Sequence, residues 1–197
     1  MGGGRRDQVV AAAAKLFAAE GYHGASMRDI GFQVGLLKGS LYAHVANKQE
    51  LLLEIASAAA RSFAAALEPI CRAPTPAPEK LRLALRTHCA VVHEQVAVAT
   101  VYRREARHLD GQPAAWVRQA RHRYEALWLG IFQQGCAEGT FRADLDPAAA
   151  CALALAAAWS ATDGTRPALD DPTSYADSMC DLLLSGCRSE DHTAGCR

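Results

Sequence analysis

The 197-residue sequence predicts an all-α protein of about nine helices, with a compact N-terminal three-helix domain and a larger C-terminal helical domain. Apolar residues recur three and four positions apart in most segments, which is the spacing of one helix face. Ser, Asn or Asp stands at several expected helix starts, and Gly or Pro separates successive segments. No segment favours a strand.

Residues 26–50 predict two short helices, a glycine turn and the start of a third helix. Ser26 and Asp29 have the spacing of a capping box. Gly35 supplies the backbone freedom that a sharp turn needs, and the second helix begins near Lys38. Two helices joined in this way are typical of a helix-turn-helix, whose second helix enters the major groove of DNA. The alternative is a compact three-helix packing without this role.

The second of these helices is expected to present a small face. If Leu41 and Val45 point inward, the rotation of about 100° per residue puts Gly39, Ser40 and Ala43 on the opposite side. Such a face fits deep in the major groove, while flanking side chains contact phosphates. For the flanking histidine alone, the alternative is a solvated surface position. The predicted DNA-binding residues are Ser26, Arg28, Lys38, Gly39, Ser40, Tyr42, Ala43, His44 and Lys48.

Residues 8–52 carry a family resemblance. The stretch AAAKLFAAEGYHGASMRDIGFQVGLLKGSLYAHVANKQELL resembles the N-terminal domain of TetR/AcrR-family transcriptional regulators, with their LFAEKGY first helix end, T-x-R-D-I-A second helix and G-x-x-K-G-S-L-Y-x-H-F recognition helix. This resemblance implies a regulator, usually a repressor, that binds double-stranded DNA. Leu37 stands where the family usually has a capping Ser or Thr, Ala43 where His or an aromatic is frequent, and Val45 where Phe is usual. A lost cap costs about 1 kcal/mol.

The remainder of the chain predicts further helices. Asn47 starts a helix that Pro69 is expected to end at about Glu68, and the proline-rich stretch 73–78 predicts a linker, because proline lacks an amide donor. Other helices are expected at 79–109 with a break, 113–138, 147–162 and 172–185, with a polar loop at 163–171. The predicted domains are 1–50 for DNA binding, 51–187 for ligand binding and dimerisation, and 188–197 as a disordered tail.

The last two helices predict a homodimer interface. In AAACALALAAAWSA, small residues lie on nearly every side of the helix, so a neighbouring backbone can approach closely. A helix that is apolar all round is expected to be buried, and two helices from each protomer would build a four-helix bundle. A dimer also suits a helix-turn-helix protein that binds a palindromic operator. The alternative is burial of both helices within one protomer.

An aromatic stripe in the middle helices is predicted to line an apolar pocket, the alternative being ordinary core. A basic run between Arg103 and Arg123 lies next to it and would suit a ligand with phosphates, unless it is a solvated helix face. The pattern E-A-x-x-L … R-x-x-Y-E-x-x-W … G-x-x-E-G-x-F-R-x-D-L-D-P, from Glu105 to Pro147, resembles the TetR subgroup that controls fatty-acid or steroid catabolism. That resemblance implies a small hydrophobic effector such as an acyl-CoA. The competing prediction is a constitutive DNA-binding regulator without an effector. The predicted pocket residues are Tyr102, Trp116, Tyr124, Trp128, Phe132 and Trp159.

Composition argues against several other classes of protein. The formal net charge is zero, with a slight positive excess in the first fifty residues, which agrees in sign with DNA binding. Arg5 and Arg6 are expected either to form an arm along DNA or to belong to a disordered tail. No apolar run approaches the roughly 18 residues that cross a bilayer, and no signal-peptide pattern is present, so a cytoplasmic protein without a membrane partner is expected.

Seven cysteines without a C-x-x-C spacing argue against a disulfide framework or a zinc ribbon. Buried thiols are expected instead, with a redox sensor as the alternative. Cys89 and His93 could form half of a metal site, but no second pair at helical spacing accompanies them. Cys89 with His88 is the nearest approach to a nucleophile and base, and no oxyanion motif lies nearby. The sequence therefore predicts no enzyme activity, no metal site and no cofactor.

Overall fold

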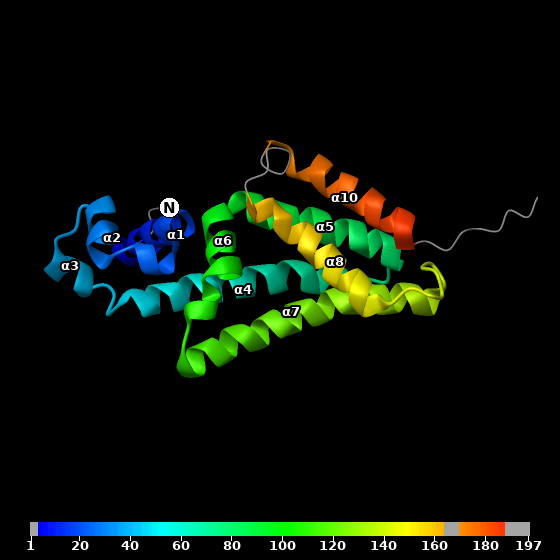
Figure 1. Cartoon of the computed structure of the whole chain (residues 1–197), viewed down its shortest axis with the longest axis horizontal. Helices are drawn as coiled ribbons and strands as arrows, with labels where there is room; N and C mark the ends of the chain where they lie inside the picture. Colours follow the sequence, from blue (N-terminus) through cyan, green and yellow to red (C-terminus); the bar gives the residue numbers. More distant parts are fainter. Residues whose placement is uncertain (1–3, 164–169, 188–197) are drawn as a thin grey trace, which may run out of the picture. The chain divides into compact units, whose positions relative to one another are not determined.

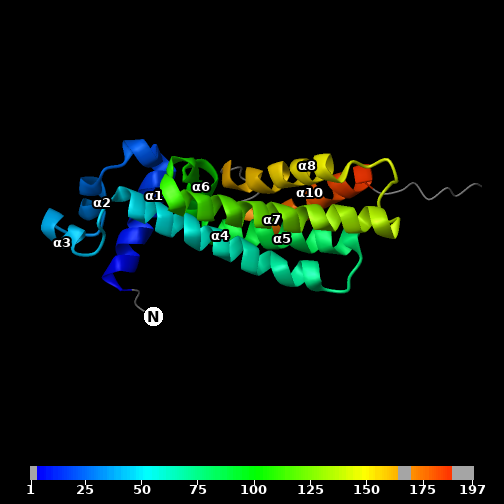
Figure 2. The same ribbon diagram turned by 90° about the horizontal axis from the view of Figure 1, so that it is seen from below.

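The computed structural model describes residues 4–163 and 170–187, and over these residues it has nine α-helices and no strand (Figures 1 and 2). This confirms the all-α prediction. The chain divides into two compact units, residues 1–64 with 94–122 and residues 65–93 with 123–197. The domain limits predicted at residues 50 and 187 stay predictions. The predicted tail, 188–197, and most of the loop predicted at 163–171 fall outside the described residues.

The first unit is built around α1, whose Val9, Ala13 and Phe17 are buried. Ile30 and Leu41 of the next two helices are also buried. Helix α6 packs against α1. The elements of this unit are α1 (Arg5–Gly24), α2 (Met27–Gln33), α3 (Lys38–Tyr42), the first part of α4 (Lys48–Arg72), α6 (Val96–Arg104), the 3₁₀ turn η1 (Ala106–His108) and the first part of α7 (Gly111–Glu138).

The second unit has an aromatic and aliphatic core in which Leu81, Trp128, Phe132 and Phe141 are buried. Gly135 makes room for Phe141, because a Cβ at this glycine would lie 2.2 Å from the phenylalanine ring. Helices α8 and α10 are in contact. The elements are the end of α4, α5 (Ala77–Glu94), the second part of α7, α8 (Pro147–Trp159), the 3₁₀ turn η2 (Ser160–Asp163) and α10 (Pro172–Cys187).

The prediction that Pro69 ends its helix is wrong, because α4 continues through this proline to Arg72. Proline removes one amide donor, but its carbonyl still accepts, and the amide of Ala73 donates to the Pro69 carbonyl oxygen at 3.1 Å. The break expected within 79–109 is confirmed. Helix α5 ends at Glu94 and α6 begins at Val96.

Ion pairs join α5 to α10 in the second unit. The Arg86 guanidinium donates to both carboxylate oxygens of Asp177, at 2.6 and 2.8 Å, and Arg82 donates to Asp181 at 2.7 Å. The hydrogen bond from Arg86 lowers the pKa of Asp177. These groups are partly exposed, so the pairs add orientation more than stability.

Candidate nucleic-acid interface

Helices α2 and α3 form a helix-turn-helix whose turn follows from local chemistry. The Ser26 hydroxyl accepts from the Asp29 amide at 3.2 Å and caps α2. Gly35 has φ +66°, a conformation that favours glycine. The Leu36 amide donates to the Gly31 carbonyl at 2.9 Å, and a Cβ on Gly31 would lie 3.0 Å from the Leu36 carbonyl oxygen. A glycine at this position therefore lets the turn fold tightly against α2.

The outward face of α3 is as small as the sequence predicts. Leu41 and Val45 are buried at 1% and 2% exposure, whereas Gly39, Ser40 and Ala43 are exposed. A hydroxyl and a methyl group on a narrow face can both reach base edges in a major groove.

The predicted flanking contacts occupy different environments. Ser26, Arg28, Lys38 and Tyr42 are exposed, and His44 is half-buried. The Ser26 hydroxyl, the two cationic side chains and the Tyr42 phenol are groups that suit phosphate contacts.

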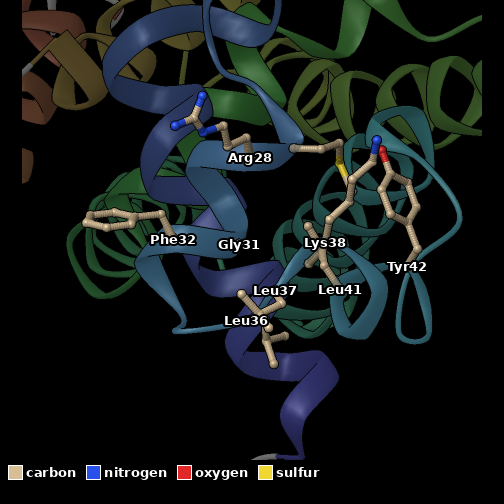
Figure 3. Close-up of a pocket in the computed structure, with 9 residues that line it drawn as sticks. Arg28, Gly31, Phe32, Leu36, Leu37, Lys38, Leu41 and Tyr42 are labelled. Carbon is tan, nitrogen blue, oxygen red and sulfur yellow. The ribbon is translucent and has the colours of Figure 1, made fainter.

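A groove with a volume of about 540 Å³ runs across α2 and α3 (Figure 3). It mixes cationic and apolar side chains on one surface. The groove is lined by Met27, Arg28, Gly31, Phe32, Leu36, Leu37, Lys38, Leu41 and Tyr42.

Lys48 has a structural role that the sequence pattern did not indicate. Its ammonium donates to the carbonyls of Tyr22 and Ala25, at 2.6 and 2.9 Å, and lies 4.4 Å from the centre of the Tyr22 ring. Lys48 thereby ties the start of α4 to the end of α1. Of its three N–H groups, two are used in this way. Its phosphate contact stays a prediction.

Arg6 forms neither a DNA arm nor part of a disordered tail, so both expectations are wrong for this residue. It lies within α1 and donates to the Glu50 and Glu54 carboxylates, at 2.6 and 2.7 Å, and to the carbonyl oxygen of His44. The hydrogen bond from Arg6 lowers the pKa of Glu50. The bonds from Arg6 to the two glutamates join α1 to α4. These residues are far apart in the sequence, so the local pattern could not indicate the contact.

The six predicted pocket residues are divided between the two units, four in the second and two in the first. In the second unit, Tyr124, Trp128 and Trp159 gather around His88, whose Nδ1 lies 2.7 Å from the Tyr124 hydroxyl and whose ring centre lies 4.6 Å from that of Trp159. Phe132 in the same unit packs against Phe141 instead.

The other two predicted pocket residues lie in the first unit. Tyr102 is buried and stacks on Phe63, with ring centres 6.1 Å apart. Trp116 is 43% exposed, and Arg61 lies over its ring.

Sequence reasoning missed two groups of side chains. The sequence pattern puts His88 on the apolar face of α5, but it does not indicate that the aromatic rings of α7 and α8 surround it. The second group joins α1 to the segment after α6: His23 Nε2 lies 3.2 Å from His108 Nδ1, and the Tyr22 amide donates to Glu105 at 2.9 Å. These partners are more than eighty residues apart, so no local signal links them.

No cysteine lies in α2 or α3. The cysteines of the described residues are free thiols, and burial raises the pKa of both Cys89 and Cys151 to about 11. Among the described residues, no group of three or more His, Cys, Asp or Glu side chains could hold a metal ion. No helix in the described part of the chain is long and apolar enough to span a bilayer.

Family models match both parts of the chain. The model described as "Bacterial regulatory proteins, tetR family" matches residues 9–55, which include the helix-turn-helix. The model described as "Tetracyclin repressor-like, C-terminal domain" matches residues 74–187. Together they extend over most of the sequence.

Known proteins agree with these matches. The HTH-type transcriptional repressor KstR2 of Mycolicibacterium smegmatis is 30% identical over 143 residues, which cover 72% of this chain and 70% of that protein. The structure of the ketosteroid transcriptional regulator KstR2 of Mycobacterium tuberculosis has a TM-score of 0.87 at 24% identity, with 96% of this chain and 98% of that chain covered. The structure of AibR in complex with isovaleryl coenzyme A and operator DNA has a TM-score of 0.81 at 23% identity, covering 92% and 98%. At these identities, the two structures show a shared fold.

Proposed function

Because this chain is a transcriptional repressor of the tetR family of bacterial regulatory proteins, we propose that a small hydrophobic effector, such as an acyl-CoA, releases it from a palindromic operator. The predicted family resemblance is confirmed, and so is the prediction that the chain is not an enzyme. We place its site of action in the cytoplasm, where operator DNA lies.

Operator recognition is supported by the exposed face of α3. Ser40 and Ala43 would contact base edges, while Arg28, Lys38 and Tyr42 would contact phosphates on either side. A change at Ser40 should therefore alter the preference between sequences. Loss of the Tyr42 side chain should weaken binding to all sequences alike.

Dimerisation is supported by apolar side chains that the second unit leaves exposed. Leu153 of α8 is 66% exposed and Leu182 of α10 is 77% exposed, and these two helices are in contact. A second copy would cover both leucines in a four-helix arrangement. Glutamate at both positions should convert the dimer to monomer in analytical ultracentrifugation. Glutamate at Leu83, a half-exposed leucine of α5, is the matched control and should leave the dimer intact.

The effector site is supported by the cluster around His88. The indole nitrogen of Trp128 is buried and has no hydrogen-bond partner among the described residues. A buried N–H without an acceptor is costly, and an acceptor on a ligand would relieve that cost. The ring of Tyr124 lies beside that of Trp128, and the ring of Trp159 lies beside that of His88, so the cluster is mainly apolar. The unpaired N–H of Trp128 is thus the main support for the effector site, and an apolar ligand with a carbonyl oxygen suits the cluster.

A thioester of coenzyme A fits this chemistry and the sequence around it. The acyl chain would occupy apolar surface, and the thioester carbonyl would accept from Trp128. AibR, which shares the fold, was solved with isovaleryl coenzyme A, and this makes acyl-CoA the first class to test.

Release would pass through the joint between α6 and α1. The Glu105 carboxylate accepts from the Tyr22 amide at the end of α1, and His108 contacts both Tyr22 and His23. Lys48 of α4 also bonds the end of α1. A displacement of α6 would therefore move α1 and, through α1, the recognition helices. An effector that prefers the displaced conformer shifts the population away from DNA.

The proposal is tested by fluorescence anisotropy on the intergenic DNA upstream of the gene. Palmitoyl-CoA or isovaleryl-CoA is expected to weaken DNA binding by about 5- to 150-fold, whereas coenzyme A alone and the free acids should have less effect. The Trp128→Phe variant keeps an aromatic ring but loses the indole N–H, so it should bind DNA normally and respond less to the thioester. If no thioester changes DNA affinity, the protein is a constitutive regulator or takes another effector class, and this proposal fails.

A further inference from the structure

Two large apolar side chains stand out on the surface of the helix-turn-helix. Phe32 is 87% exposed and Leu37 is 83% exposed, which makes them the most exposed large hydrophobic residues of the described chain. Single exposed apolar residues are common on protein surfaces. These two, however, line the same groove as Arg28 and Lys38.

The exposure of Leu37 follows from its place in the chain. It is the N-cap of α3, with extended backbone angles of −71° and 156° and no side-chain capping bond. Leu41 fills the interior instead, at 1% exposure, and Leu36 is half-buried. Leu37 thus contributes neither a cap nor core packing. It lies one helical turn before Ser40, the residue best placed to contact a base edge.

We propose that Leu37 recognises the C5-methyl group of a thymine in the operator, as a specificity-determining residue. This inference rests on the DNA-binding part of the proposed function and is independent of the effector. The thymine methyl is the apolar group that the four ordinary base pairs present in the major groove. An exposed leucine beside the base-reading face matches that group in chemistry.

Charge and position favour DNA over a protein as the occupant of this end of the groove. Arg28 and Lys38 line it, which suits a polyanion and disfavours a purely apolar partner. Figure 3 shows Phe32 pointing away from the end at which Lys38 and Tyr42 lie. Phe32 therefore distinguishes the two kinds of partner. Binding of a protein that covers the whole groove would depend on both Phe32 and Leu37, whereas the thymine contact depends on Leu37.

The test begins with operator selection from a random duplex pool by the full-length protein. Each thymine of the selected site is then replaced by deoxyuridine, which lacks only the methyl group. At one symmetric pair of thymines, affinity should fall by about 4-fold per half-site, from the roughly 0.8 kcal/mol of one buried methyl group, and by about 15-fold per palindrome. The Leu37→Ala protein should show no loss at that pair.

Leu37→Ser separates this contact from helix stability, because serine restores an N-cap. It should also lose the response to deoxyuridine while keeping the fold. Leu83→Ala, on an exposed leucine of the second unit, is the control and should respond like the wild type. The inference is wrong if no thymine substitution affects the wild type, or if Leu37→Ala and Leu37→Ser still respond fully. If affinity depended equally on Phe32, and loss of the Phe32 side chain also changed the number of dimers bound per operator, a protein partner would be favoured instead. Failure to select any sequence would overturn operator recognition as well.

Discussion

The functional side chains of the helix-turn-helix are exposed, whereas those of the His88 cluster are buried. In the helix-turn-helix, Ser40 and Lys38 are exposed on a helix of five residues. In the cluster, Trp128 is 0% exposed and His88 2% exposed, between helices far apart in the sequence. A change in the first region should therefore alter binding and leave stability almost unchanged. A change in the second should alter stability and effector response together.

The largest expected effect is the loss of Trp128. Trp128→Ala should lower the free energy of unfolding by about 3–5 kcal/mol, because it removes a fully buried ring and leaves a cavity. Trp116→Ala, at a half-exposed tryptophan, should cost about 1 kcal/mol or less. Urea denaturation followed by circular dichroism compares the two. Similar losses would mean that the cluster is no more tightly packed than the surface.

Lys48 lies in the DNA-binding unit but is expected to affect stability, because its ammonium bonds two backbone carbonyls. Lys48→Met should cost about 1.5–3 kcal/mol, the range for hydrogen bonds to charged groups. Lys38→Met should cost less than about 0.5 kcal/mol, but should lower the salt dependence of DNA binding by about one phosphate contact per protomer. If Lys48→Met left stability unchanged, its tie to α1 would be unimportant in solution.

A smaller effect is expected at the α5–α10 ion pairs. Because Arg86 lowers the pKa of Asp177 below its ordinary value, the pair stabilises the fold fully at pH values above the ordinary aspartate pKa of about 4. That contribution is lost as the pH falls through the lowered pKa. The stability difference between the wild type and Asp177→Asn should thus be constant near neutrality and shrink in acid. A difference that grew as the pH fell would contradict the sign of this pKa change.

The smallest expected signal is thiol labelling. Burial raises the pKa of Cys89 and Cys151 to about 11, so few thiolates form at pH 8. Iodoacetamide followed by peptide mass spectrometry should label both only after unfolding. Rapid labelling of the folded protein would revive the redox alternative.

The predictability of the two regions differs for a physical reason. Capping by Ser26, the turn at Gly35 and the outward position of Ser40 depend on neighbours in sequence, and each agrees with the pattern. The bonds of Arg6 and the cluster around His88 join distant helices, so spacing alone could not indicate them. The aromatic stripe showed which residues are large and apolar, but not that Tyr102 and Tyr124 belong to different units.

Control of the DNA-binding face by a separate effector site can be measured as one ratio, the operator Kd with palmitoyl-CoA divided by the operator Kd without it. Lys38→Met should raise both Kd values and leave their ratio unchanged from the wild type. Trp128→Phe should leave the Kd without ligand unchanged and bring the ratio toward one. A ratio of one in the wild type, or a ratio that depends on Lys38 and not on Trp128, would show that the His88 cluster does not control DNA binding.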